Sequence, residues 1–218
     1  MQISVIDLGI GNLRSVEQAL NCVAPEADTI VTSDPAIIGA SDKVVLPGQG
    51  AIGTWLEALR ERQLMAVLQR ALEEKPLLGI CVGMQALFGY CEEDGGLQGL
   101  GLFAGSVRHF RHFHAPADKA SVKLKIPQMG WNQVSQCQDH PLWEGIVDQA
   151  HFYFVHSFCS NLDNGSHRNV VFGEADYGHR FIAAVGRDNV FAVQFHPEKS
   201  HNDGLQLLKN FTRWNGAV

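Results

Sequence analysis

The sequence lacks three features that would place it in other protein classes. No apolar run approaches the roughly 18 residues that cross a bilayer, and no basic segment precedes the apolar stretch in MQISVIDLG. Dense Lys/Arg tracts are also missing: 17 basic and 23 acidic residues give a formal net charge of -6. Such a chain has no strong patch for phosphate groups. We therefore expect a cytosolic protein that binds neither membrane nor nucleic acid.

Disulfide and zinc frameworks are not expected either. The five cysteines are odd in number, scattered, and without CxxC spacing. Cys22, Cys91, Cys137 and Cys159 lie in settings typical of reduced packing thiols. Only the setting of Cys81 suggests chemistry.

Two patterns indicate ligands only weakly. DLGIGNLRS carries Gly9 and Gly11 after a strand-type run, but the third glycine of a dinucleotide-binding fingerprint is missing. RHFRHFHAP holds His109, His112 and His114 without the neighbouring Cys, Asp or Glu that would complete a metal site. We expect no cofactor and no metal.

The first half of the chain alternates between strand-type and helical patterns. Apolar strand-type runs occupy residues 3–7, 43–48 and 76–80, and helical periodicity occupies residues 13–23 and 55–74. A third helix start is expected in GMQALFGY, directly after the third strand. Continuous apolar strands that alternate with helices predict a doubly wound, mostly parallel α/β sheet with helices on both faces.

The alternation of strand-type and helical patterns ends after Gly95. Short strand-type runs separated by turn residues predict a mostly antiparallel extension of the sheet. Residues 201–214 have the spacing of a closing helix, with Ser200 or Asn202 as its cap. No repeat, low-complexity segment or Pro/Ser linker interrupts the sequence, so we expect residues 1–218 to form a single domain.

Cys81 lies in GICVGMQ, between a buried strand and a helix. Gly-x-Cys-x-Gly is the cysteine counterpart of the Gly-x-Ser-x-Gly nucleophile elbow. Gly79 and Gly83 let the strand and helix approach closely, and a helix amino terminus favours a thiolate. Taken alone, the motif leaves a nucleophile and a packing cysteine about equally open.

A second motif, QFHPEKS, supplies the groups that a cysteine nucleophile needs. His196 and Glu198 are two residues apart, so an extended chain would point both to one face. A carboxylate beside an imidazole fixes its tautomer and stabilises the imidazolium. Separately, each residue is more often a hydrogen-bonded strand-end histidine or a solvated acid. Together with Cys81 they fill the roles of nucleophile, base and orienting acid.

These two motifs resemble those of the class I (triad) glutamine amidotransferases, and the resemblance spans nearly the whole chain. DLGIGNLRSV, LPGQGAI, PQMGWNQV and FVHSF resemble the branch of that family that serves a (β/α)8 cyclase in histidine biosynthesis. The resemblance implies a flavodoxin-like class I glutaminase fold. It also implies hydrolysis of L-glutamine to glutamate and ammonia through a cysteinyl thioester, with ammonia passed to the cyclase subunit of a heterodimer.

The resemblance assigns roles residue by residue. The catalytic residues would be Cys81, His196 and Glu198. An oxyanion hole would come from the backbone of Val82, Gln49 and Gly50, and a substrate pocket from Gly48, Gln85, His156, Ser157 and Phe158. The docking face for the cyclase would include Asn12, Met129, Trp131, Asn132 and Lys199.

Plainer interpretations stay open for these segments. Residues 47–50 also read as an ordinary strand-ending turn, Gln85 as an exposed helix residue, and residues 156–158 as a strand with alternating burial. Two other functions also stay open: a related glutaminase for a different synthase, such as one that modifies a surface sugar, and a non-catalytic binding module. The complete set of Cys81, His196 and Glu198 argues against the module, and the identity of a co-purified partner would decide between the two glutaminases.

Overall fold

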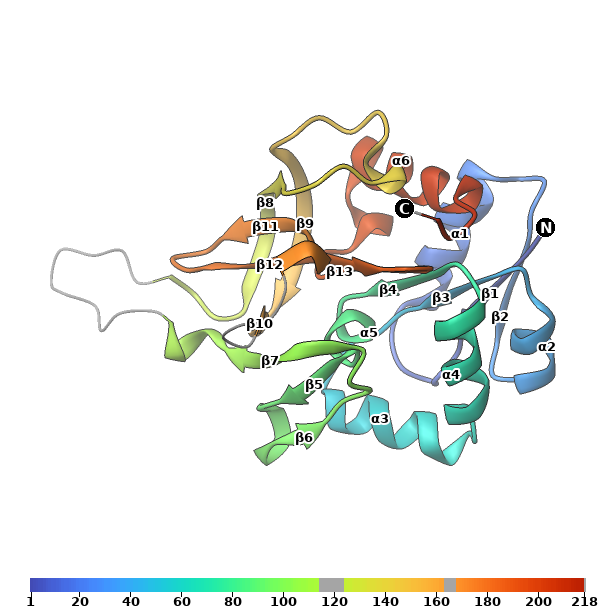
Figure 1. Ribbon diagram of the computed structural model, residues 1–218, viewed down its shortest axis with the longest axis horizontal. Helices are drawn as coiled ribbons and strands as arrows, with labels where there is room; N and C mark the ends of the chain where they lie inside the picture. The colour runs from blue at the N-terminus through green and yellow to red at the C-terminus, as the bar shows by residue number, and fades with distance from the viewer. Residues whose placement is uncertain (114–123, 163–167, 218) are drawn as a thin grey trace, which may run out of the picture.

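A continuous sheet forms the centre of the protein in the computed structural model (Figure 1), which describes residues 1–113, 124–162 and 168–217. Its parallel part has the strand order β2-β1-β3-β4-β13. The bounds of these strands are β1 Gln2–Ile6, β2 Asp28–Thr32, β3 Lys43–Leu46, β4 Leu77–Ile80 and β13 Val190–Val193. Every residue of β3, β4 and β13 is buried, because helices cover both faces.

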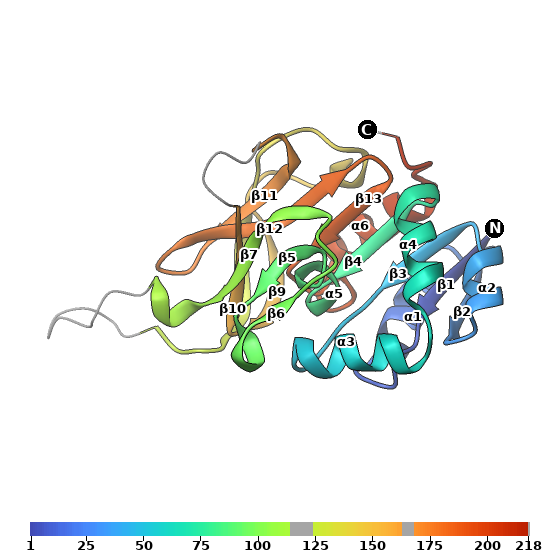
Figure 2. The same cartoon turned by 60° about the horizontal axis from the view of Figure 1, so that its bottom comes forward.

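Helices lie on both sides of the parallel part (Figures 1 and 2). On one side, α1 (Leu13–Val23) lies beside α6 (His201–Arg213). The other side carries α3 (Ile52–Glu61) and α4 (Met65–Glu74), and α4 contacts α2 (Pro35–Ala40). The helices turn apolar stripes inward, such as Val16, Ala19 and Leu20 of α1. The expected doubly wound α/β architecture is confirmed.

The sheet continues through β13 into a mostly antiparallel part with the order β13-β12-β10-β7-β5-β6. Strand β11 pairs with β12 and β8, and β8 pairs with β9. The bounds are β5 Phe88–Cys91, β6 Leu97–Gln98, β7 Phe103–His109, β8 Gln128–Gln136, β9 Ala150–His156, β10 Phe158–Leu162, β11 Val171–Asp176 and β12 Arg180–Arg187. The expected antiparallel extension is confirmed, although β5 and β7 run parallel.

Short 3-10 helices connect these strands. Their bounds are η1 Glu93–Gly95, η2 Phe110–His112, η3 Pro141–Trp143, η4 Arg168–Val170 and η5 Pro197–Lys199.

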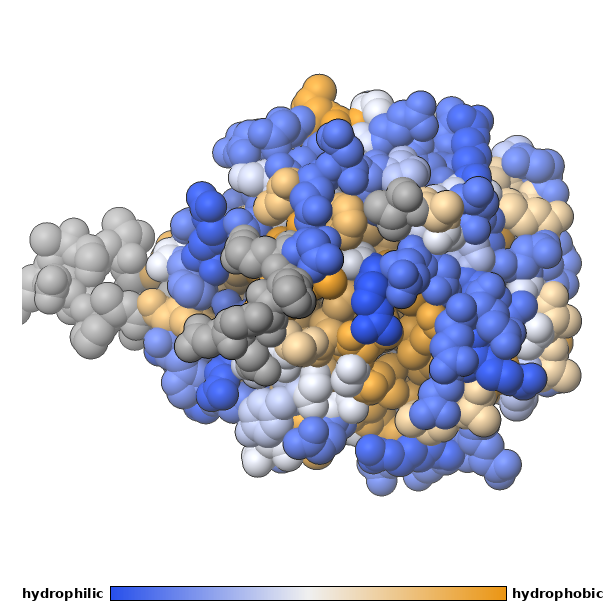
Figure 3. Space-filling view, viewed as in Figure 1, coloured by the Kyte–Doolittle hydropathy of each residue, from blue (hydrophilic) through white to orange (hydrophobic). Residues whose placement is uncertain are grey.

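On the face drawn in Figure 3, hydrophobic residues reach the surface between α4 and the β5–β7 region, with hydrophilic residues around them. Within the described ranges, no helix has the length and apolarity needed to cross a membrane.

Several local expectations are corrected by the structure. The helix whose start was expected in GMQALFGY is only α5 (Val82–Gln85), after which the chain enters β5. The helical stretch at 55–74 is divided into α3 and α4 around Gln63, whose φ is 57°. Strand β2 and helix α2 were not identified from the sequence. His114 lies outside the described residues. So does the start of the strand-type run ASVKLKIPQMGWNQV, whose end forms part of β8.

The closing helix is confirmed as α6, but its cap differs from the expectation. The Ser200 side chain makes no cap hydrogen bond. Its hydroxyl instead donates to His196 O at 2.6 Å and accepts from Tyr153 N at 3.0 Å. Ser200 therefore fastens the segment around His196 to β9.

Candidate active site

Cys81 occupies the sharp turn between β4 and α5, where the parallel and antiparallel parts of the sheet meet (Figures 1 and 2). Its backbone has φ 56° and ψ -110°, a conformation that non-glycine residues rarely adopt. Two hydrogen bonds hold it: Cys81 N donates to Val193 O at 2.8 Å, and Gln85 N donates to Cys81 O at 3.0 Å. This strained strand-to-helix turn is the geometry of a nucleophile elbow.

His196 and Glu198 form a buried pair just beyond β13. His196 Nδ1 donates to Glu198 Oε1 at 2.8 Å, and both side chains are only 1% exposed. Glu198 lies in the 3-10 turn η5 rather than in an extended strand, so the turn, not strand alternation, brings the two side chains together. The carboxylate fixes the proton on Nδ1 and leaves Nε2 for proton transfer.

The surroundings of His196 favour its charged form. Burial by itself would lower its pKa, but the negative charge of Cys81 and the hydrogen bond and charge of Glu198 raise the pKa of His196 to about 10. Within the described residues, however, no group lies in hydrogen-bonding geometry with Nε2. We therefore regard the attraction between Cys81 and the ring as mainly one of charge. Loose geometry of this kind is common between a nucleophile and its base before the transition state forms.

The elbow and His196 share a cavity of about 410 Å³ at the carboxyl ends of β3, β4 and β13. This edge is where ligands bind in open α/β sheets. The cavity is lined by Gln49, Gly50, Cys81, Val82, Gln85, Glu93, Pro127, Val155, His156, Ser157, Phe158, His196 and Lys199. A nucleophile, a base and several polar groups therefore face one cavity that is large enough for an amino acid.

A second histidine in the cavity, His156, has a different protonation state from His196. His156 Nδ1 donates to Phe158 O at 2.6 Å, and its Nε2 lies 3.0 Å from the side-chain amide of Gln128. Burial, opposed by the Phe158 carbonyl and reinforced by His196, lowers the pKa of His156 to about 4. His156 is thus neutral near pH 7 and supports the pocket wall, whereas His196 is placed for proton transfer.

The loop of residues 47–50 lies directly against the elbow. A Cβ atom on Gly48 would come within 2.6 Å of Gly83 N and 2.7 Å of Val82 Cβ, so only glycine permits this approach. Gln49 ties the loop to its neighbour on the other side, because its Oε1 accepts from Asn12 N at 3.2 Å. Backbone groups of the loop and of Val82 therefore border the same end of the cavity.

Most residues selected from the sequence line this cavity, but several do not. Glu198 lies behind His196, and with Gly48 and Asn12 it borders a small void next to the cavity. Met129, Trp131 and Asn132 lie on β8 outside the cavity lining.

Sequence reasoning overlooked two polar residues of the site. Glu93 of η1 lines the cavity, and burial raises the pKa of its carboxyl group although Ile52 N donates to it at 2.9 Å. Gln194 is wholly buried, and its amide reaches Cys81 Sγ at 3.6 Å. A lone glutamine in the apolar run VFAVQF was a signal that could have identified Gln194, whereas Glu93 had no comparable signal.

A larger hollow of about 840 Å³ lies elsewhere, over β5 and β7. It is bordered by Tyr90, Arg108 and Arg187, and its lining contains neither a cysteine nor a histidine. Among the described residues, no cluster of three or more His, Cys, Asp or Glu side chains could hold a metal ion. We therefore place the candidate active site in the smaller cavity, on the basis of its chemistry.

The chain is similar to known proteins over nearly its full length. The chain is 50% identical to the imidazole glycerol phosphate synthase subunit HisH of Dechloromonas aromatica, covering 97% of this chain and 96% of the relative. It is 49% identical to subunit HisH 1 of Pseudomonas aeruginosa, covering 98% and 97%.

Solved structures agree on the fold. A crystal structure of a glutamine amidotransferase matches with a TM-score of 0.67 at 20% identity, covering 96% of this chain and 98% of that one. The family model for glutamine amidotransferase class-I matches residues 4–214. The chain therefore belongs to the class I glutamine amidotransferase family.

Proposed function

We propose that this protein is the glutaminase subunit of an imidazole glycerol phosphate synthase, working as one glutamine amidotransferase domain in the cytoplasm. The single observation that carries the proposal is the Cys81 elbow facing the His196–Glu198 pair across one cavity. The names of relatives at 47–50% identity over nearly the full chain support the choice of synthase.

The reaction begins with attack of the Cys81 thiolate on the side-chain amide carbon of glutamine. His196 carries the proton that the departing ammonia takes up, and a thioester with the glutamyl group is left on Cys81. Water, deprotonated by the same imidazole, then adds to the thioester and releases glutamate. Glu198 keeps the ring in the tautomer that both steps require.

Both steps pass through an oxyanion that needs hydrogen-bond donors. The Val82 N–H follows the nucleophile on the first turn of α5, which is the usual place for one donor. The loop of residues 47–50 supplies the other, from the backbone of Gln49 or Gly50. Loss of one such donor typically lowers turnover about 100- to 1000-fold.

The polar groups of the cavity match the amino-acid end of glutamine. Glu93 offers a carboxylate for the α-ammonium group, and the Gln85 amide also lines the cavity. His156, Ser157 and Phe158 close the cavity on the side of β9 and β10. A carboxylate in the lining suits a ligand that carries an ammonium group, such as an amino acid, better than a purely anionic ligand.

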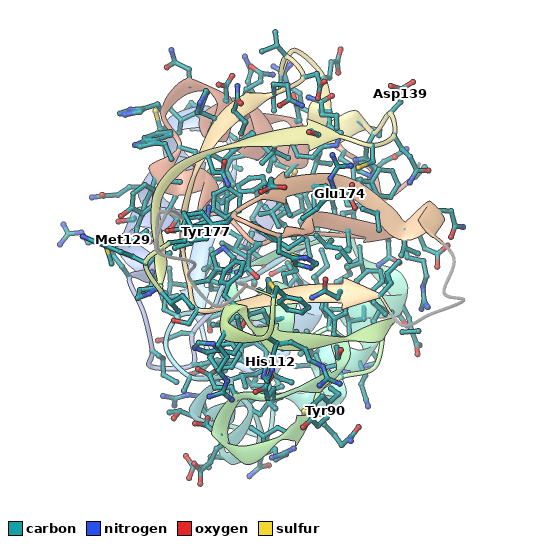
Figure 4. The ribbon with its side chains drawn as sticks, turned by 90° about the vertical axis from the view of Figure 1, so that its left-hand side faces the viewer. Tyr90, His112, Met129, Asp139, Glu174 and Tyr177 are labelled. Carbon is teal, nitrogen blue, oxygen red and sulfur yellow. The ribbon has the colours of Figure 1, made fainter. Side chains whose placement is uncertain are left out.

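The product requires a partner, because free ammonia would be protonated in water at neutral pH and lost as a nucleophile. We propose that a (β/α)8 cyclase docks at the mouth of the cavity and receives the ammonia in a heterodimer. The exposed apolar residues Met129 and Trp131, 66% and 45% exposed, support this docking face. Met129 points away from the body of the protein (Figure 4). Asn12, Asn132 and Lys199 complete the proposed face.

Glutamate release, measured with and without the purified cyclase and its nucleotide substrate, tests the proposal. We expect Cys81→Ala to abolish glutamine-dependent turnover while the complex still uses added ammonium salts. Cys137→Ala removes an exposed cysteine that lies outside the cavity and is the matched control, with full activity expected. Loss of ammonium-dependent turnover in Cys81→Ala would contradict this division of labour, and a sugar-modifying synthase as the co-purified partner would contradict the choice of synthase.

A further inference from the structure

Gln194 is a wholly buried polar side chain for which the reaction described above has no role. It follows β13 and precedes His196 by two residues, and its backbone N–H donates to Ala183 O at 2.9 Å. A buried side-chain amide is costly unless its oxygen and nitrogen find partners. The partners of Gln194 therefore indicate what it does.

Its partners form a chain of hydrogen bonds that fixes the direction of each amide. Phe158 O is a backbone carbonyl and only accepts, so the group of Gln85 that lies 3.2 Å away is its NH2. The same NH2 donates to Gln194 Oε1 at 3.0 Å. The oxygen of Gln194 thus faces Gln85, and its own NH2 faces Cys81 Sγ at 3.6 Å.

An N–H aimed at sulfur favours the thiolate over the neutral thiol, since a hydrogen bond to an ionised group is stronger than one to a neutral group. It also restricts the position of Sγ, on a residue whose backbone is already strained. We propose that Gln194 holds the reactive sulfur of Cys81 as a thiolate, in an orientation that Gln85 enforces from the cavity wall. The inference rests on the proposed function only in taking Cys81 as the nucleophile.

The rate of alkylation of Cys81 by iodoacetamide, resolved by site with mass spectrometry between pH 5 and 9, reports thiolate without glutamine or cyclase. We expect Gln194→Met, which keeps the bulk but cannot donate, to lower the Cys81 rate at pH 7 about tenfold. Gln194→Glu turns a carboxylate toward the sulfur and should lower the rate further. The exposed Cys22 and Cys137 serve as internal standards whose rates stay unchanged.

Gln85→Met tests whether the hydrogen bond from Gln85 orients the Gln194 amide, and it leaves the contact between Gln194 and Cys81 in place. Freed from Gln85, the Gln194 amide loses its fixed direction, and we expect Cys81 alkylation to slow by about threefold at pH 7. In the assembled enzyme, Gln194→Met should lower kcat more than it changes KM, whereas Gln85→Met should raise KM.

Asn210→Leu is the matched control for the loss of a buried amide. Asn210 of α6 donates to Leu142 O and Glu144 O, away from the cavity, so its replacement should cost stability but leave Cys81 alkylation unchanged. An unchanged Cys81 rate in folded Gln194→Met would overturn the inference. If wild-type Cys81 reacts no faster than Cys22 and Cys137 at pH 7, the assignment of the nucleophile itself fails.

Discussion

Replacement of Gly83 by alanine tests how closely the elbow is packed against the end of β3. A Cβ atom on Gly83 would lie 2.0 Å from Leu46 O and 3.0 Å from Leu46 C. These are backbone atoms, so no side-chain rotation relieves the overlap. Leu46 is the last residue of β3, directly before the loop of residues 47–50.

The size of the effect follows from the overlap. The end of β3 and the elbow must separate by about 1 Å, and forced overpacking of this kind typically costs about 1–3 kcal/mol of stability. The same displacement moves the loop away from Val82, and a misplacement of about 1 Å at a reacting centre costs about 100-fold in rate. We therefore expect Gly83→Ala to lose both stability and glutaminase turnover.

Urea unfolding followed by tryptophan fluorescence measures the stability, and glutamate release by the cyclase complex measures the turnover. Gly39→Ala is the matched control, because a Cβ there meets only Val67 Cγ2, at an ordinary 3.7 Å. Gly39 lies inside α2, so alanine should stabilise the protein by about 0.5–1 kcal/mol and leave turnover unchanged. The reasoning is refuted if Gly83→Ala unfolds at the wild-type urea concentration and keeps full turnover.

Three further predictions concern the pocket wall, acid stability and the docking face. Glu93→Gln should raise the KM for glutamine about tenfold with little change in kcat, because a charged hydrogen bond to the α-ammonium is lost; a change confined to kcat would contradict this role. Burial lowers the pKa of His140 from 6.5 to about 4, so its folded form stays neutral while its unfolded form takes up a proton. The contribution of His140 to the free energy of unfolding is therefore fully present above pH 6.5. It is lost as the pH falls toward 4, because protonation then favours the unfolded state. Between pH 7 and pH 4.5, the free energy of unfolding measured with urea should therefore fall by about 2 kcal/mol less in His140→Gln than in the wild type. An identical fall in the two proteins would exclude His140 as a cause. Trp131→Ala should weaken cyclase binding about tenfold in titration calorimetry without lowering stability, whereas Val147→Ala, at another exposed apolar residue, should not; equal effects of the two would contradict the proposed face.

Local patterns were sufficient where the local chain itself imposes the geometry. The glycines around Cys81 predicted the elbow, because close strand-to-helix packing excludes larger side chains at those positions. The buried strands β3 and β4 were evident from their continuous apolar runs. The closing helix α6 was evident from the spacing of Leu205, Leu208 and Phe211.

The same patterns failed where distant partners decide the structure. An apolar run such as ALFGY does not by periodicity alone distinguish a buried helix from a strand. Residues Phe88–Cys91 form a strand because β7 and β6, which come later in the chain, pair with both of its edges. Similarly, Glu93 was not recognised because nothing near it in the sequence shows that η1 borders the cavity.

By itself, the sequence determined which reactive side chains the protein has, namely Cys81, His196 and Glu198, and the turn that holds Cys81. Only the tertiary structure decided which groups meet, because the alignment of β13 beside β4 pairs Val193 with Ile80. That register places Cys81, which follows Ile80, next to Gln194 and His196, which follow Val193. A local pattern carries no information about strand register between segments more than a hundred residues apart, so the amide that reaches the sulfur became evident only in the folded protein.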